Sequence, residues 1–211
     1  MHAQWRSSRR NIASFVSAVI LTAMMAGSVS AGRPDSVDPA LMTPPLNPSF
    51  TWECWRTGTG IVCDGERTLT YTAIEAIPCP DGGWIYVSGT DQRTLRRVGD
   101  SEGRALRTLE TVRIDDRLSR SPEFDGVVGV GRGIWTDAYE YPIPGDLASR
   151  IVTRRGIDAV VTIPGHGTIA IDVGIRSWDI DENILFARGN LIEDIEAAFA
   201  TACDALASES S

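Results

Sequence analysis

The stretch Thr168-Ile-Ala-Ile-Asp-Val-Gly-Ile-Arg-Ser-Trp178 decides the fold class of this sequence. Its large apolar residues recur at every second position, at Ile169, Ile171, Val173 and Ile175. A period of two is the pattern of a β-strand with one buried face, because successive side chains of a strand point to opposite sides. The stretch therefore predicts a strand in a sheet that is covered on one face.

Segments of the same character precede and follow this strand. β-Branched and aromatic residues recur in seven of them, which we predict to be strands: 67–73, 84–88, 105–114, 127–139, 151–154, 159–163 and 184–188. Short connections rich in Gly, Asp and Asn separate most of them, so consecutive strands should pair antiparallel. We expect a mainly β domain, an antiparallel up-and-down meander of about eight to ten strands.

A meander of this size closes into a barrel or folds into a two-layered sandwich. Gly129, Gly131 and Gly133 lie on one face of a predicted strand and leave that face without side chains. Glycines of this kind permit strong curvature, so the sequence favours an up-and-down barrel over a sandwich. The alternative is that the glycines make room for a neighbouring aromatic side chain, such as Trp135 or Trp178.

A single α-helix is predicted at the C-terminal end of the domain. Asn190 is a suitable N-cap, and Glu193 follows it three residues later. Apolar residues then recur at a spacing of three to four, which gives the helix one apolar stripe: Ile192, Ile195, Phe199, Ala202 and Leu206. We expect this stripe to pack against the sheet.

Residues 1–31 have the features of a secretory signal peptide. Three arginines precede an apolar segment without charge, residues 12–26, and small residues stand at Val29 and Ala31. We expect cleavage after Ala31 and a location outside the cell or in its envelope. The alternative is an uncleaved signal that anchors the chain in a membrane. Residues 32–49 contain five prolines and predict a linker, 50–206 a single β-rich domain, and 207–211 a disordered tail.

The four cysteines predict disulfide bonds, because they follow an export signal and are even in number. Cys54 and Cys63 flank a predicted hairpin turn, so we favour this pair, which leaves Cys79 with Cys203. Four cysteines allow three pairings, and a metal site is the alternative to disulfides. The spacing of these cysteines matches no CxxC pattern, so we expect no metal.

The composition excludes several chemistries. All 20 basic residues are arginine, so the chain has no lysine for a Schiff base or a phosphate-binding loop. His166 is the only histidine after His2, which excludes a site with several histidine ligands. The 28 acidic residues outnumber the 20 arginines, and the resulting net charge of −8 disfavours nucleic acid as a partner. We expect no cofactor.

Three residues are the candidates for ligand binding: Arg97, Arg155 and His166. The pairs Arg96-Arg97 and Arg154-Arg155 break the alternation of their strands, so one arginine of each pair should point inward. An inward arginine needs an acidic partner or an anionic ligand, and the alternative is a strand end or a bulge. His166 lies between two glycines, as a general base on a loop or as a turn residue. No catalytic residue is predicted.

The pattern Glu53-Cys54-Trp55-x-x-Gly58-x-Gly60-Ile61-x-Cys63, with the later Cys79 and Cys203, resembles a group of small secreted actinobacterial proteins with four cysteines, itself uncharacterised. The resemblance covers residues 53–206 and implies secretion and a β-rich fold, but no active-site residue. From the sequence we expect a non-catalytic protein that binds a small apolar ligand or a surface protein or glycan. The alternatives are a carboxylate-dependent hydrolase of cell-envelope polymers and a structural envelope protein.

Overall fold

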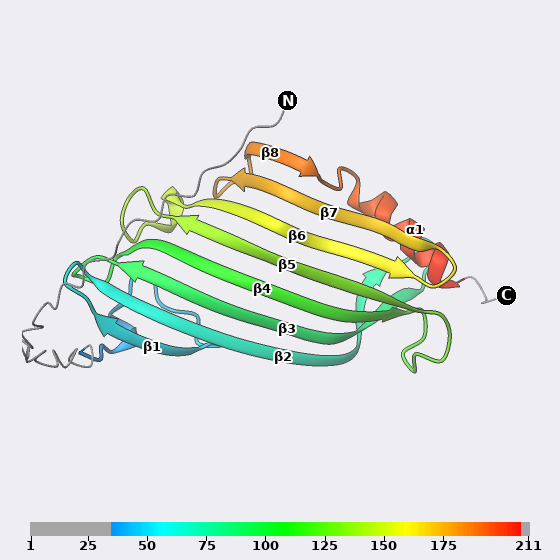
Figure 1. Cartoon of the computed structure of the whole chain (residues 1–211), viewed down its shortest axis with the longest axis horizontal. Helices are drawn as coiled ribbons and strands as arrows, with labels where there is room; N and C mark the ends of the chain where they lie inside the picture. Colours follow the sequence, from blue (N-terminus) through cyan, green and yellow to red (C-terminus); the bar gives the residue numbers. More distant parts are fainter. Residues whose placement is uncertain (1–34, 208–211) are drawn as a thin grey trace, which may run out of the picture. The chain divides into compact units, whose positions relative to one another are not determined.

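Eight strands form one antiparallel sheet in sequential order, and an α-helix follows them (Figure 1). The computed structural model describes residues 35–207, so the predicted signal peptide and its cleavage site lie outside the described residues. The elements are β1 (Thr51–Arg56), β2 (Ile61–Pro78), β3 (Trp84–Gly99), β4 (Ala105–Ser119), β5 (Val128–Glu140), β6 (Ile151–Ile163), β7 (Gly167–Trp178), β8 (Ile184–Asn190), α1 (Ile195–Ala207) and two 3-10 turns, η1 (Pro39–Leu41) and η2 (Leu147–Ser149). The predicted meander with a C-terminal helix is confirmed.

The sheet is not closed, because β1 and β8 lie at its two edges. The preference for a barrel over a sandwich therefore stays a prediction. Most strands are longer than predicted, and the segments 151–154 and 159–163 belong to the single strand β6. The pairing of β6 with β7 shifts register between Ile157 and Ala159, and this irregularity interrupts the period of two that the sequence pattern relies on.

The two faces of the sheet differ. The inner face is the one on which α1 and residues 35–50 pack, and the outer face is the opposite one. Alternate residues of neighbouring strands share a face, so the paired residues Arg97 and Thr108 point inward, whereas their chain neighbour Arg96 points outward. The inner face is apolar at both ends of the strands and charged in the middle.

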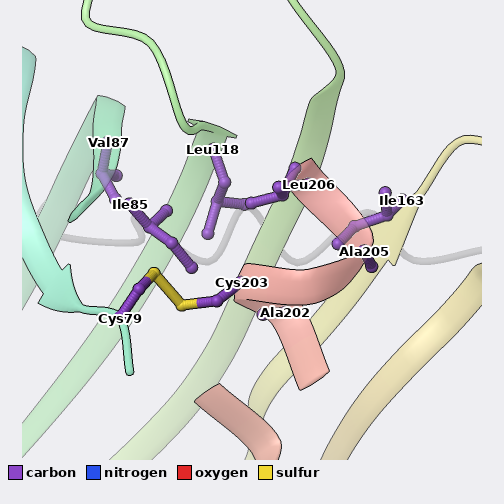
Figure 2. Packing of buried hydrophobic residues seen from close by; sticks show 9 residues of the cluster. All are labelled: Cys79, Ile85, Val87, Leu118, Ile163, Ala202, Cys203, Ala205 and Leu206. Carbon is purple, nitrogen blue, oxygen red and sulfur yellow. A yellow bond between two sulfur atoms is a disulfide. The ribbon is translucent and has the colours of Figure 1, made fainter. Parts of the chain in front are cut away.

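At one end of the inner face, α1 covers the sheet. Ala202, Cys203, Ala205 and Leu206 are buried there in one cluster with residues of β3, β4 and β6. Figure 2 shows the Leu206 side chain directed at Leu118 and the disulfide between Cys79 and Cys203 beside Ile85. This bond fastens the last helix to the end of β2, 124 residues earlier in the chain.

The helix begins later than its sequence predicts. Asn190, the expected N-cap, is the last residue of β8 and pairs with Val173 of β7. Asp194 performs the capping, since its Oδ1 accepts a hydrogen bond of 2.9 Å from the backbone N–H of Ala197. Ala207, expected in the tail, is the last residue of α1. Strand pairing, which is a tertiary interaction, thus decides where the helix starts.

At the other end of the inner face, residues 35–50 pack against the sheet, although the sequence predicts a linker at 32–49. Val37 and Met42 are buried there with Ile61 and the Cys54–Cys63 disulfide. Met42 fits because Gly99 leaves room for it: a Cβ at Gly99 would lie 2.9 Å from the Cε of Met42. The two disulfides, Cys54–Cys63 and Cys79–Cys203, are the pairs that the sequence favours.

The three glycines of β5 make room for side chains that lie over them. A Cβ at Gly133 would lie 2.8 Å from the Trp135 ring, and one at Gly131 would lie 3.1 Å from Leu118. A Cβ at Gly129 would lie 3.0 Å from Ile163, beside α1. The three glycines thus accommodate neighbouring side chains. At Gly133 the neighbour is the aromatic ring of Trp135, as in the alternative interpretation of the sequence.

Candidate functional site

A hollow of about 320 Å³ lies on the inner face, between residues 44–50, strands β2–β5 and the loop after β5. We call it the inner hollow. It is lined by Pro44, Pro45, Asn47, Phe50, Arg67, Arg93, Leu95, Arg97, Thr108, Glu110, Tyr139, Tyr141, Leu147 and Arg150. Four of these residues are arginines and only one is acidic, in a chain whose net charge is −8. The inner hollow is therefore a local concentration of positive charge.

A larger hollow, of about 520 Å³, lies elsewhere on the sheet. Apart from Arg67 and Arg93, every residue that lines it is exposed, among them Glu66, Gln92 and Arg113. It has no aromatic side chain among its lining residues. Binding sites for small molecules combine apolar or aromatic walls with a few polar groups, so the inner hollow is the better candidate despite its smaller volume.

The N-terminal segment forms one wall of the inner hollow and is held by hydrogen bonds. Nη1 of Arg97 donates to the carbonyl oxygen of Pro44 at 2.9 Å. Nε1 of Trp52 donates to the carbonyl oxygen of Asn47 at 2.8 Å. The ring of Phe50 lies in this wall, with the guanidinium of Arg67 4.8 Å from its centroid. The wall depends on Arg97, because this side chain ties the sheet to the proline segment.

Arg97 has no acidic partner within residues 35–207. Its Nε donates to Oγ1 of Thr108 at 3.0 Å, and no carboxylate of residues 35–207 lies within 4.0 Å of its guanidinium. Burial lowers the pKa of this guanidinium. The side chain is thus fixed in direction by neutral oxygen atoms while its charge is left unpaired.

Arg150 also has no acidic partner within residues 35–207. Its guanidinium lies 5.8 Å from the centroid of the Tyr139 ring, and it forms no ion pair with any carboxylate in the described part of the chain. Its Nε is buried and donates no hydrogen bond to any described residue. The Nε of Arg67 is likewise buried without an acceptor. A buried N–H group without an acceptor destabilises the folded protein. These two Nε atoms are therefore hydrogen-bond donors that a ligand can satisfy.

The other charges of the inner hollow are paired. Arg93 donates to Asp91 at 2.8 Å and to Glu110 at 3.0 Å. The hydroxyl group of Tyr139 donates to Glu110 at 2.8 Å, and burial raises the pKa of Tyr139 above its usual value. The phenol therefore stays neutral at physiological pH and acts as a donor.

A second cluster of charges lies beside the inner hollow, on β5, β6 and β7. Arg154 donates to Asp137 at 2.8 Å and to Asp158 at 2.9 Å. Arg176 donates to Asp158 at 2.6 Å and to Asp172 at 2.9 Å. Each arginine here lies between two carboxylates, in contrast to Arg97 and Arg150. Hydrogen bonds and charge attraction from these acids outweigh burial and raise the pKa of Arg154.

A third group consists of Tyr71 and Asp116, near the middle of the inner face. The Tyr71 hydroxyl group donates to the Asp116 carboxylate. Burial raises the pKa of Asp116, and the nearby Asp91 and Asp115 raise it further, against the lowering effect of the Tyr71 hydrogen bond. Asp116 is thus a carboxyl group that its surroundings keep protonated to higher pH than usual.

The structure separates the three candidates that the sequence predicts. Arg97 points inward and lines the inner hollow. Arg155 is exposed and does not line the inner hollow, and Arg154 is the inward member of that pair. Val152 and Arg154 are two residues apart and share the inner face. Arg155 is the next residue and therefore points to the outer face. His166 is exposed in the turn between β6 and β7, where its backbone N–H donates to Ile163.

Most residues of the inner hollow are not predicted from the sequence. Tyr139, Tyr141 and Arg150 come from β5 and the loop after it, and Pro44 comes from the predicted linker. One signal was present: Asp91, Arg93, Leu95 and Arg97 alternate along one strand and so share a face. The predicted strand 84–88 stopped short of them, which hid the pattern.

Comparisons with family models, with curated proteins and with solved structures gave no match. Within residues 35–207, no helix is long and apolar enough to cross a membrane, and no group of three or more metal-ligating side chains is found. The geometry of the inner hollow is therefore the best indication of what this protein binds.

Proposed function

We propose that this protein is a non-catalytic binding protein whose small ligand occupies the inner hollow. The observation that carries the proposal is the construction of that hollow. Its volume of about 320 Å³ lies within the usual range for ligand sites, about 300–1,000 Å³. Phe50, Tyr139, Tyr141 and Leu147 provide apolar contact area, and a few polar groups converge between them. Aromatic and apolar surface beside charged and polar groups is a combination that can orient a small molecule.

We further propose that the protein acts outside the cytoplasm, after export and cleavage behind Ala31. The charged and apolar parts of residues 1–31 support this step. The two disulfides support it as well, because such bonds persist in oxidising compartments and are rare in the cytosol. N-terminal sequencing of the exported protein tests the cleavage site, and a mature chain that begins before Gly32 would contradict it.

Native mass spectrometry of protein purified from its own secretion medium tests the binding function. We expect a small molecule to copurify with the wild type. The variant Leu147→Trp places a large ring at the inner hollow and should lose that molecule. Leu41→Trp is a matched control, because Leu41 is also an exposed leucine in a 3-10 turn but does not line the hollow. Wild-type protein without any bound molecule, or equal retention by both variants, would argue against the proposal.

A second candidate function is hydrolysis of a cell-envelope polymer through carboxylates. The observation in its favour is the raised pKa of Asp116, which suits a general acid, near Asp91 on the neighbouring strand. Asp91 pairs with Ile114, so Asp91 and Asp116 are diagonal neighbours with Cα atoms about 7–8 Å apart. Glycosidases place their two carboxyl groups about 5–10 Å apart. Release of soluble sugar fragments from envelope material, abolished in Asp116→Asn and in Asp91→Asn, tests this function.

A further inference from the structure

We propose that the ligand of the inner hollow carries an oxyanion, a carboxylate or a phosphate, that is bound by Arg97 and Arg150. This inference rests on the proposed binding function and specifies the chemistry of the ligand. It differs from the sequence-based expectation, which is a small apolar ligand or a surface protein or glycan. The anion site follows in three steps, from the balance of charge, the unused hydrogen-bond donors and the geometry of a guanidinium group.

The first step is the balance of charge. Of the four arginines that line the inner hollow, Arg93 is paired with Asp91 and Glu110, and Arg67 reaches Asp91 at 3.4 Å. Arg97 and Arg150 have no carboxylate within 4.0 Å among residues 35–207. Unpaired charge that is partly removed from water is unfavourable and is compensated by a group of opposite sign. An anionic ligand supplies that group.

The neighbouring cluster on β5–β7 makes this contrast sharper. There the inward arginines Arg154 and Arg176 each lie between two carboxylates, at distances of 2.6 to 2.9 Å. The same domain thus pairs Arg154 and Arg176 fully in one place, whereas Arg97 on β3 and Arg150 in the loop before β6 have no acidic partner within residues 35–207. The chain has 28 acidic residues, so a shortage of carboxylates is not the reason. The unpaired arginines coincide with the hollow.

The second step is the unused donors. Nε of Arg150 is buried and makes no hydrogen bond in the described part of the chain, whereas Arg97 uses Nε and Nη1 for Thr108 and Pro44. These two hydrogen bonds fix the orientation of the Arg97 guanidinium, and its Nη2 has no partner within residues 35–207. A small rotation of Arg150 toward an oxyanion gives its Nε an acceptor. Binding then satisfies donors that the unliganded protein leaves without partners.

The third step is the geometry of recognition. The planar guanidinium fork matches the two oxygen atoms of a carboxylate or phosphate and is preferred over an ammonium group for this purpose. Thr108 and Pro44 hold Arg97 in place before the ligand arrives, which lowers the entropy cost of binding. Tyr139 and Tyr141 provide aromatic surface for the rest of the ligand. An organic acid with a ring fits this arrangement.

Calorimetric titration of the full exported protein tests the inference with three probes: benzoate, phenyl phosphate and the uncharged benzamide. We expect at least one of the two anions to bind, more weakly as salt is raised, and benzamide to bind at least about ten-fold more weakly than that anion. Arg97→Gln and Arg150→Gln should each weaken binding of the anion by about ten-fold or more. Arg96→Gln is the matched control, since Arg96 lies on the outer face and pairs with Asp64.

The outcomes separate this inference from the function on which it rests. Equal binding of benzamide and the anions, or unchanged binding in both arginine variants, would overturn the anion site and leave the binding function standing. No binding of any probe, together with an empty wild-type protein in native mass spectrometry, would overturn both. Arg97→Lys checks for a folding defect: it keeps the charge and should restore part of the affinity that Arg97→Gln loses. The salt dependence of anion binding by the wild type tests the charge interaction without any variant.

Discussion

Gly133 shows most clearly how a single residue fits this sheet. A Cβ there would lie 2.7 Å from the backbone oxygen of Asp158 as well as 2.8 Å from the Trp135 ring. The backbone oxygen belongs to a paired strand and cannot move aside cheaply. Gly126, in contrast, lies before β5, and apart from its chain neighbours no heavy atom of residues 35–207 lies within 4 Å of the position of a Cβ.

We therefore expect Gly133→Ala to destabilise the protein by about 1–3 kcal/mol through overpacking. Gly126→Ala should change the free energy of unfolding by less than about 0.5 kcal/mol, because the added methyl group meets open space. Urea denaturation followed by tryptophan fluorescence measures both values. Equal unfolding midpoints for the two variants would show that the close contacts at Gly133 are not what requires a glycine.

Asp116 should make stability depend on pH. Its pKa is raised in the folded chain, chiefly by burial, so the folded state favours the protonated carboxyl. As pH rises from the ordinary value of 3.8 through the folded-state pKa, ionisation penalises the folded state and stability falls. Asp116→Asn removes this penalty and still offers an oxygen atom to Tyr71. The variant should be more stable than the wild type at pH 7.

The stability difference should shrink toward zero as pH falls below 3.8, where Asp116 is protonated in both states. Chemical denaturation of both proteins at several pH values measures it. Asp64→Asn serves as the control, because Asp64 is an exposed carboxylate paired with Arg96, and its loss should cost at most about 1 kcal/mol at pH 7. A variant less stable than the wild type at pH 7 would show that the hydrogen bond from Tyr71 outweighs burial.

Two arginine pairs illustrate what the sequence could and could not predict about single residues. Breaks in alternation at Arg96-Arg97 and Arg154-Arg155 correctly indicated that one arginine of each pair points inward. Leu95 is two residues before Arg97 and so lies on the same face of the strand, and its apolar side chain indicates that this face is the inner one. Before Arg154 both Ile151 and Val152 are apolar, so the phase of that strand is ambiguous from sequence alone. Only the pairing of Arg154 with Asp137 on β5 resolves it.

At the scale of elements, charge pairs join neighbouring strands across the middle of the inner face. Asp137 on β5 is almost fully buried, with 2% of its surface exposed, and accepts hydrogen bonds from Arg154 on β6 and from Trp135. Arg154 in turn holds Asp158, which binds Arg176 on β7. Removal of Arg154 leaves a buried carboxylate without its countercharge.

We expect Arg154→Met to destabilise the protein by about 3–5 kcal/mol, the usual cost of leaving one charge of a buried pair uncompensated. Arg155→Met should change stability by less than about 0.5 kcal/mol, since Arg155 is exposed and points to the other face. Thermal and urea unfolding of the two variants provide the measurement. A large loss in Arg155→Met, or none in Arg154→Met, would reverse the assignment of their faces.

The start of the helix shows the limit of sequence patterns for an element. Asn190 and Glu193 have the spacing of a capping pair, and the apolar stripe correctly places Ala202 and Leu206 against the sheet. Asn190 is nevertheless taken by β8, because Val173 offers it a strand partner. Local propensity locates a helix, whereas pairing with a distant segment decides its first residue.

At the scale of the whole described domain, a single open sheet is stabilised at two ends by different means. α1 and the Cys79–Cys203 bond cover one end, and residues 35–50 with the Cys54–Cys63 bond cover the other. The meander and the cysteine pairing follow from periodicity and spacing in the sequence. The inner hollow does not, because it needs the N-terminal segment to fold back onto strands whose full length no local pattern shows.

The two disulfides should therefore differ in what they stabilise. Cys79 and Cys203 are 124 residues apart, so in the chain-entropy model their bond contributes about 5 kcal/mol, against about 2–3 kcal/mol for Cys54 and Cys63, which are 9 residues apart. We expect the double variant C79S/C203S to lose more stability in urea than C54S/C63S. The second variant should instead loosen residues 35–50, because Met42 and Val37 pack against that bond.

Limited proteolysis measured beside urea unfolding distinguishes these effects. C54S/C63S should be cut first between residues 35 and 50 while most of its global stability remains, and it should lose ligand binding with the wall of the inner hollow. C79S/C203S should release α1 and expose the apolar cluster around Ile85 and Leu118, which a fluorescent hydrophobic dye detects. If C54S/C63S proves the less stable of the two in urea, local packing at the N-terminal segment, and not loop closure, dominates the stability of this domain.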